Sequence, residues 1–359
     1  MQHLTHRVAV ITGAASGIGL ALAKRFAQEG MRMVLADIEP ARLSQALAEV
    51  QALGADAIAV TTDVGVETQV NTLADAAFAR FGAVHLLCNN AGVSSPALTS
   101  AGWQSPLSDW QWILQVNLMG VLYGLRAFVP RMLEAGDEGH IVNTASVAGL
   151  ITAAHPYHVS KHAVACITEG LYKDFKRGGA RLSASVLCPG LIRTEILHAE
   201  RNRHAEFGPP TDLSQAPETV QHAVAAFAKA LDAGYEPAAV ADAVVEGIRA
   251  DQFYIIPAQP ALQDMVTVRM QDIVERRNPS LPPPWVRADA SQTPGDPVGQ
   301  ARSKLRSLIA EGIRCGDGRE PTPEVATSIN LDSAVERARA RRAGLGWQGA
   351  TKTRAQRPR

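Results

Sequence analysis

Seven short apolar runs, separated by stretches long enough for helices, constrain the fold of this 359-residue chain most strongly. Runs that are apolar throughout are typical of strands buried on both faces, and the segments between them suit crossover helices. The pattern predicts an α/β fold in which a doubly wound parallel sheet of about seven strands is flanked by helices. The expected strands are Arg7–Ile11, Met33–Ala36, Ile58–Thr61, His85–Cys88, His140–Asn143, Leu182–Cys188 and Phe253–Ile256.

The alternation ends near residue 278. Six prolines follow between Pro279 and Pro297, and a stretch so rich in breakers suits neither a central strand nor a long helix. From Ser280 onward the chain has 14 basic and 8 acidic residues. We therefore expect one domain over residues 1–278 and an irregular, flexible tail over 279–359, Pro-rich and then basic, with possible short helices at 301–313 and 331–343. A binding role for this tail is an open alternative.

Composition narrows the class of protein. The chain is 46% hydrophobic, and its 35 acidic residues balance its 35 basic ones. This excludes a disordered protein and gives no sign of a nucleic-acid partner. The sequence has neither an apolar run long enough to cross a membrane nor the pattern of a secretory signal, and its four cysteines are widely scattered. We expect a cytoplasmic protein without a membrane or nucleic-acid partner.

A glycine-rich stretch directly follows the first predicted strand and opens the first predicted helix. It runs from Thr12 to Gly19 and contains Gly13, Ser16, Gly17, Ile18 and Gly19. Glycines there let a pyrophosphate approach backbone N–H groups at a helix end whose dipole favours anions. The strand–turn–helix context favours a dinucleotide site.

Asp37 ends the second predicted strand, 24 residues after Gly13. A carboxylate there can accept hydrogen bonds from both adenosine ribose hydroxyls and would repel a 2′-phosphate, which favours NAD over NADP. The nearest guanidinium in sequence, that of Arg42, lies about one helical turn away. The alternative is that Asp37 merely caps the following helix.

Tyr157 and Lys161 are spaced i and i+4 at the start of a helical pattern, so both lie on one helix face. An ammonium near a phenol stabilises the phenolate and lowers its pKa, as a general base requires. The pair is thus suited to removing a proton from an alcohol.

These motifs, taken together, resemble the short-chain dehydrogenase/reductase family in its single-domain form. The resemblance covers roughly residues 5–260, with the motifs in the family's order. The matching pieces are Thr12 to Gly19, Asp63-Val64, Asn89 to Gly92, Asn117, Ile141 to Asn143 with Ser146, Tyr157 to Lys161, and Pro189-Gly190 followed by Thr194.

The resemblance implies a Rossmann-type fold and a set of residue roles. Tyr157 would be the acid/base, Lys161 would lower its pKa and hold the nicotinamide ribose, Ser146 would bond the substrate oxygen, and Asn117 would support a proton-relay water. Thr144 is a fallback for Ser146. It also implies a homodimer or homotetramer. The implied cofactor-binding set is Thr12, Gly13, Ser16, Gly17, Ile18, Gly19, Asp37, Asp63, Val64, Asn90, Ala91, Gly92, Tyr157, Lys161, Pro189, Gly190, Ile192 and Thr194.

The substrate pocket should form from loops at the carboxyl ends of the strands. Apolar residues in these loops favour an apolar alcohol or ketone, although they could equally pack on one another. The segment at about 191–237 is long enough for a lid. The candidate pocket residues are Trp103, Ser146, Leu150, Ile151 and Leu197, with Phe207 and Phe227 in the lid.

Three histidines near the same helix start offer a different interpretation. His158 and His162 have the i, i+4 spacing of zinc ligands, with His155 close by. They are rotated away from the face of Tyr157 and Lys161, and no further ligand is at a persuasive spacing, so we expect no metal site.

The sequence therefore predicts an NAD-dependent oxidoreductase that interconverts a secondary alcohol and a ketone, with a small molecule as its partner. Two alternatives stay open: an NADPH-dependent carbonyl reductase, and a catalytically silent dinucleotide-binding regulator. Asn117, Ser146, Tyr157 and Lys161 are all present, which disfavours the regulator.

Overall fold

The computed structural model describes residues 1–95, 102–151, 153–209, 212–257 and 259–280. The predicted tail from residue 281 onward, with its two possible helices, lies outside the described residues.

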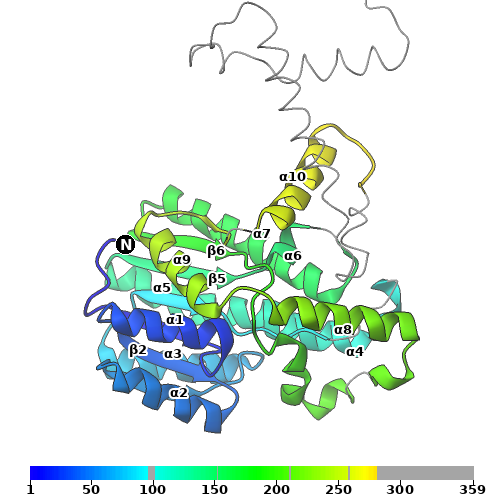
Figure 1. Ribbon diagram of the computed structural model, residues 1–359. Helices are drawn as coiled ribbons and strands as arrows, with labels where there is room; N and C mark the ends of the chain where they lie inside the picture. The colour runs from blue at the N-terminus through cyan, green and yellow to red at the C-terminus, as the bar shows by residue number, and fades with distance from the viewer. Residues whose placement is uncertain (96–101, 152, 210–211, 258, 281–359) are drawn as a thin grey trace, which may run out of the picture. The chain divides into compact units, whose positions relative to one another are not determined.

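A seven-stranded parallel sheet forms the centre of the molecule, in the strand order β3-β2-β1-β4-β5-β6-β7 (Figure 1). The predicted doubly wound fold is confirmed, and each strand lies within one residue of its expected bounds. The strands are β1 Val8–Thr12, β2 Arg32–Asp37, β3 Ala57–Thr61, β4 Leu86–Asn89, β5 Gly139–Thr144, β6 Leu182–Leu187 and β7 Tyr254–Ile255.

Helices cover both faces of the sheet. The principal ones are α1 Gly17–Gln28, α2 Pro40–Ala52, α3 Glu67–Phe81, α4 Leu107–Leu114, α5 Gly120–Ala135, α6 Val147–Leu150, α7 Pro156–Arg177, α8 Glu218–Asp232, α9 Pro237–Arg249 and α10 Pro260–Val274. Short 3-10 turns lie at Gly102–Gln104, Ile196–Asn202, Ala205–Phe207 and Leu213–Gln215, and a π-helical turn, Gln115–Met119, joins α4 to α5.

The hydrophobic core consists of two layers, one on each face of the sheet. In β1, Ala9 and Ile11 point to one layer, and Val8 and Val10 point to the other, because successive side chains of a strand alternate. The first layer packs against α1, α2 and α9, and α1 lies beside α9 in Figure 1. The second packs against α3, α5 and α7. Burial on both faces explains why the strands are apolar throughout.

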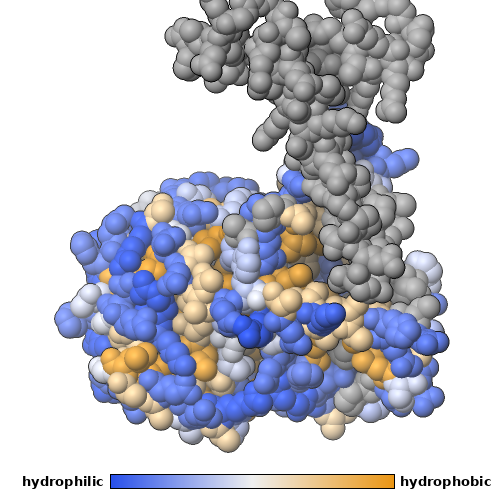
Figure 2. Space-filling model, viewed as in Figure 1, coloured by the Kyte–Doolittle hydropathy of each residue, from blue (hydrophilic) through white to orange (hydrophobic). Residues whose placement is uncertain are grey.

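The stretch Leu107–Ala135, which spans α4, the π-helical turn and α5, has the length and composition of a membrane-crossing helix. Half of its most apolar window is buried inside the protein, and Trp112 and Phe128 are fully buried. It is packed as a core helix of this fold. The face seen in Figure 2 is mostly hydrophilic, and apolar residues reach it only in separate patches.

Strand order reverses between β1 and β4, since the chain runs outward from β1 through β2 and β3 and then returns to the other side. Loops at the carboxyl ends of the strands diverge at such a point and leave a crevice, which is where open α/β sheets bind ligands. The fold therefore places the loops after β1, β2, β4, β5 and β6 around one site.

Candidate active site

One cavity of about 1670 Å³ lies at the carboxyl edge of the sheet. Most of the predicted site residues line it: Gly13, Ser16, Gly17, Ile18, Asp37, Asp63, Val64, Asn90, Ala91, Gly92, Ser146, Ile151, Tyr157, Lys161, Pro189, Gly190, Ile192, Thr194 and Leu197. Five do not line it: Thr12, Gly19, Trp103, Asn117 and Leu150. The fold thus joins the two predicted halves, the phosphate turn and the Tyr157 group, in a single space.

The glycine-rich turn has the backbone shape that a phosphate site needs. Gly13 and Gly17 have positive φ angles of 65° and 53°, and a Cβ on Gly13 would lie 2.8 Å from the Cα of Ala91. Ser16 precedes α1 but makes no side-chain hydrogen bond to its first turn. The positive end of α1 therefore faces the cavity without a side-chain cap, which fits a pyrophosphate.

Gly19 serves packing in this structure rather than ligand contact. A Cβ there would lie 1.9 Å from the carbonyl oxygen of Gly13. Thr12 has a similar supporting role, since its Oγ1 accepts hydrogen bonds from the backbone N–H groups of Asn90 (3.0 Å) and Ala91 (3.1 Å). The Asn90 side chain donates back to the Thr12 carbonyl at 3.0 Å. These bonds hold the loops after β1 and β4 together.

Asp37 ends β2 with its carboxylate bonded by backbone groups. Oδ2 accepts from the N–H of Ala15 and Oδ1 from the N–H of Glu39, both at 3.0 Å. Burial raises the pKa of Asp37, and these hydrogen bonds oppose that shift. The N-cap residue of α2 is Glu39, so the alternative that Asp37 is the cap of this helix is wrong.

Ser146, Tyr157 and Lys161 converge from α6 and α7. Ser146 is the N-cap of α6, where its Oγ accepts from the N–H of Ala148 at 3.1 Å and donates to the Pro189 carbonyl at 3.2 Å. It also lies within hydrogen-bonding reach of the Tyr157 phenol. Lys161 Nζ donates to the Thr144 carbonyl at 2.8 Å and lies 5.7 Å from the centre of the Tyr157 ring.

Burial governs the electrostatics of this group. Desolvation raises the pKa of Tyr157, and its hydrogen bond with Ser146 only partly offsets this shift; desolvation also lowers the pKa of Lys161 to about 8. The role of Lys161 in lowering the phenol pKa stays a prediction beside this effect of burial. The Lys161 ammonium is held by the Thr144 carbonyl.

Thr144, the fallback for Ser146, also lines the cavity, but its Oγ1 donates to the Asn90 side chain at 3.3 Å. Asn117 is fully buried in the π-helical turn. Its Oδ1 accepts from the N–H of Val93 at 2.8 Å, and its Nδ2 donates to the Val93 carbonyl and to Ser160 Oγ. Asn117 thus positions the loop after β4 beside the helix of Tyr157.

The substrate half of the cavity is largely apolar, but its walls differ from the prediction. Trp103 is 86% exposed outside the cavity, and Leu150 packs against the second core layer. Leu262 and Met265 of α10 also line the cavity, and they were not predicted because no motif marks that helix. Other apolar residues of this wall are Val147, Ile151, Ile196, Leu197, Phe207, Ala223, Ala226 and Phe227.

The three histidines are placed differently from one another. His155 is the N-cap of α7, where its Nδ1 accepts from the N–H of Tyr157 at 3.2 Å. His158 lines the cavity edge-on to His155, and burial lowers its pKa to about 4. His162 contacts the Gly149 carbonyl at 2.8 Å. Among the described residues, no group of three or more His, Cys, Asp or Glu side chains could hold a metal ion.

The segment at 191–237 lies along the cavity and is tied to its walls. Its two ends meet, since the N–H of Tyr235 donates to the Leu191 carbonyl at 3.0 Å and the N–H of Arg193 donates to the Tyr235 carbonyl at 2.9 Å. Between these ends, Arg203 forms a buried ion pair with Asp109 at 2.6 Å, and His204 Nε2 lies 2.9 Å from Asp63 Oδ2.

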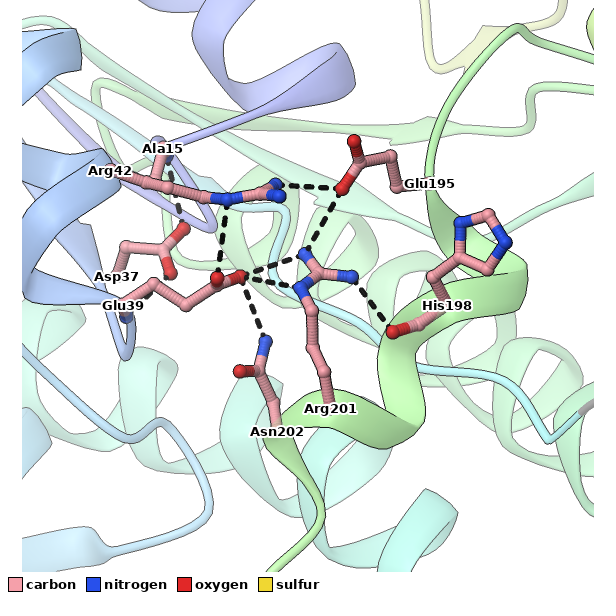
Figure 3. A network of polar contacts seen from close by, with 8 residues as sticks. All are labelled: Ala15, Asp37, Glu39, Arg42, Glu195, His198, Arg201 and Asn202. Atoms are coloured by element: carbon pink, nitrogen blue, oxygen red, sulfur yellow. Dashed lines mark hydrogen bonds and ion pairs between the residues drawn. The ribbon is translucent and has the colours of Figure 1, made fainter. Parts of the chain in front are cut away.

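A second set of contacts ties this segment to the loop after β2. Glu195, Arg201 and Asn202 reach Glu39 and Arg42 beside Asp37, as Figure 3 shows. Glu39 and Asn202 also line the cavity, and no sequence motif marks either of them.

Comparison with known proteins gives a consistent picture. A family model described as short chain dehydrogenase matches residues 7–205. The chain is 36% identical over 287 residues to 1-deoxy-11-beta-hydroxypentalenate dehydrogenase of Streptomyces exfoliatus, covering 79% of this chain and 93% of the relative. It is 32% identical over 315 residues to a C alpha-dehydrogenase of Sphingobium sp., covering 87% and 95%.

Among solved structures, the chain is similar to a short-chain dehydrogenase/reductase from Burkholderia phymatum in complex with NAD. The two share 41% sequence identity with a TM-score of 0.73, covering 79% of this chain and 99% of that one.

Proposed function

The chain belongs to the short-chain dehydrogenase/reductase family, and from this premise we propose that it is an NAD-dependent enzyme that interconverts a secondary alcohol and a ketone. The family match and the dehydrogenase relatives show that it is an oxidoreductase that acts on CH–OH groups and uses a dinucleotide cofactor. The preference for NAD and the roles of single residues belong to the proposal. The observation that carries it is one cavity lined by the glycine turn and Asp37 together with Ser146, Tyr157 and Lys161.

The residues around the cavity fit a dinucleotide. The glycine turn and the uncapped N-terminus of α1 would hold the pyrophosphate, and Asp37 would accept from the adenosine ribose hydroxyls. Ile192 and Thr194 would contact the carboxamide of the nicotinamide. When bound, NAD supplies the hydride acceptor at C4 of its nicotinamide ring.

In alcohol oxidation, the deprotonated Tyr157 oxygen removes the hydroxyl proton of the substrate as hydride leaves the carbinol carbon. Ser146 holds the same substrate oxygen by a hydrogen bond, which fixes its position beside the phenol. Lys161 contributes an ammonium fixed by the Thr144 carbonyl. In ketone reduction, Tyr157 returns the proton to the developing alkoxide, by microscopic reversibility.

The apolar walls of the substrate half favour an alcohol with an apolar body. The segment at 191–237 would act as a lid over it. We also infer a cytoplasmic enzyme, in keeping with the free thiols Cys88, Cys166 and Cys188. By resemblance to the family, α5 and α7 would form the interface of a homodimer or homotetramer, which light scattering coupled to size-exclusion chromatography would test.

The test measures absorbance at 340 nm with a panel of alicyclic, aromatic and steroid alcohols. NADH formation is followed with NAD, and NADPH formation is followed in parallel with NADP. Turnover with NAD that is lost in Tyr157→Phe, while that variant still binds NADH by fluorescence, is the expected result. Preference for NADP would establish the NADPH-dependent carbonyl reductase instead. Binding of NADH with no turnover of any panel member by the unmodified enzyme would favour the regulator.

A further inference from the structure

Four charged side chains and one amide form a cluster beside Asp37, at the end of the cavity that the proposed function assigns to adenosine. We call Glu39, Arg42, Glu195, Arg201 and Asn202 the Glu39 cluster (Figure 3). Glu39 and Arg42 come from the start of α2, and the other three come from the segment after β6. The cluster therefore brings together two parts of the chain that are about 160 residues apart.

Glu39 is the centre of the cluster. Its Oε1 accepts hydrogen bonds from Arg201 Nε at 3.0 Å, from Arg201 Nη2 at 2.7 Å and from Asn202 Nδ2 at 3.0 Å. Its Oε2 lies 3.3 Å from Arg42 Nε. Glu39 thus engages both guanidiniums, and Arg201 donates to its Oε1 through two nitrogens. Hydrogen bonds between charged groups are stronger than those between neutral ones.

Glu195 completes the neutralisation of the two arginines. Its Oε2 accepts from Arg42 Nη1 at 2.7 Å and lies 3.7 Å from Arg201 Nη2. Arg201 Nη1 donates to the His198 carbonyl at 2.8 Å. Each guanidinium therefore already has anionic partners.

Asp37 lies next to these ion pairs, but its carboxylate is held by backbone groups. It lines the same cavity as Glu39 and Arg201. No ion pair to Asp37 is found in the part of the chain that the structure describes. Three carboxylates thus lie beside two guanidiniums, and one of them, Asp37, is the group that the proposed function assigns to the adenosine ribose.

We propose that Glu39 is a second determinant of cofactor choice, which excludes a 2′-phosphate by occupying Arg201 and Arg42. This inference rests on the proposed NAD preference and extends it beyond Asp37. Two guanidiniums next to a ribose would ordinarily attract a phosphate, and bidentate Arg–phosphate pairing is a common mode of recognition. With Glu39 in place, these guanidiniums are already neutralised.

The experiment compares binding of two nicotinamide-free ligands, ADP-ribose and its 2′-phosphate, by isothermal titration calorimetry. In Glu39→Gln, which keeps the size and the acceptor oxygen but removes the charge, we expect 2′-phospho-ADP-ribose to bind about tenfold more tightly, because one repulsive charge is gone and Arg201 loses its nearest anionic partner. ADP-ribose should change by less than about threefold, since its ribose is uncharged.

Two controls separate this effect from a general change in surface charge. Glu49→Gln removes another carboxylate of α2, one that pairs with Lys24 at 2.6 Å outside the cavity lining, and should leave both affinities unchanged. Adding Arg201→Met to Glu39→Gln should reverse most of the gain for the 2′-phosphate ligand.

An unchanged affinity of Glu39→Gln for the 2′-phosphate ligand would overturn the inference, as would an equal gain for both ligands. Glu39→Ala, which removes the acceptor as well, provides a second measurement with the same expected selectivity. The unmodified enzyme tests the proposed function separately: if it binds the 2′-phosphate ligand better than ADP-ribose, the NAD preference itself is wrong, whatever the variants do.

Discussion

Lys161 is a buried ammonium whose protonation state should be measurable in the stability of the protein. Burial lowers its pKa from 10.5 to about 8 in the folded state. Between these two values the unfolded chain binds the proton that the folded protein has released. Stability therefore rises with pH across this window, and below about pH 8 the folded state must hold the desolvated charge.

We predict that this rise disappears in Lys161→Met. Urea unfolding at pH 7.5, 8.5 and 9.5 should show the stability of the unmodified protein, relative to the variant, increasing with pH by about 2 kcal/mol in total, at no more than about 1.4 kcal/mol per pH unit. Taking the difference between the two proteins cancels the contributions of titrating groups that do not interact with Lys161. A constant difference across the range would mean that Lys161 has an ordinary pKa.

Two glycines within helices test how helix packing affects stability. The same Gly→Ala substitution should stabilise the protein at one position and destabilise it at the other. Gly170 lies inside α7 with nothing within 4 Å of an added Cβ, so Gly170→Ala should stabilise the protein by about 0.5–1 kcal/mol. At Gly19 in α1, the added Cβ would lie 1.9 Å from the Gly13 carbonyl oxygen, so Gly19→Ala should cost about 1–3 kcal/mol.

The thermal midpoint of each variant, measured with and without NADH, checks this prediction. Gly170→Ala should raise the midpoint by the same amount in both conditions. Gly19→Ala should lower it and also weaken NADH binding, because the shift moves the phosphate turn. An unchanged midpoint in Gly19→Ala would show that the turn relaxes without cost.

The segment at 191–237 depends on a buried anchor. Arg203 pairs with Asp109 at 2.6 Å, with both side chains at most 2% exposed, and its guanidinium lies 5.1 Å from the Trp112 ring centre. Removing one partner of a buried pair typically costs about 3–5 kcal/mol, because the other charge is left desolvated. Arg203→Met should therefore release this segment locally.

We expect Arg203→Met to speed proteolytic cleavage within 195–209 and to raise the KM for NAD several-fold. The matched control is Arg193→Met in the same segment, whose partner Glu236 is 57% exposed. An exposed pair contributes little, so this variant should behave like the unmodified enzyme. Equal behaviour of the two variants would refute the anchoring role of Arg203.

We predict that the whole molecule divides at about residue 278 into a domain and a tail. The end of α10 is fixed by Asp272, which accepts hydrogen bonds from the backbone N–H groups of Arg277 and Ser280 at 2.8 Å, through its carbonyl and its carboxylate. Met265 is the last residue along the described chain that lines the cavity. A chain truncated after Ser280 should therefore fold and keep its turnover.

Thermal unfolding, steady-state kinetics and light scattering on the full and truncated chains check this prediction together. Equal midpoints, equal kcat values and the same number of subunits are the expected outcome. Loss of turnover or a change in subunit number would give the tail a role in the site or in assembly.

The strands, the glycine turn and the Tyr157–Lys161 pair were predictable because their signals are local. An apolar run, a positive φ at Gly13 and an i, i+4 spacing are each determined by neighbours within a few residues. The motifs also appear in a fixed order, so the carboxyl-edge cavity could be anticipated once the sheet was parallel.

Only the tertiary structure decided what depends on distant partners. Leu262 and Met265 of α10 reach the cavity by packing, Trp103 lies outside it, and Arg201 pairs with Glu39 across 162 positions of sequence. The direction of the Tyr157 pKa also follows from its burial, which no spacing reveals. The sequence by itself determined the fold and the reactive groups. Only the folded chain decided the environment of these reactive groups. Burial and ion pairing depend on neighbours that are distant in sequence and meet only after folding.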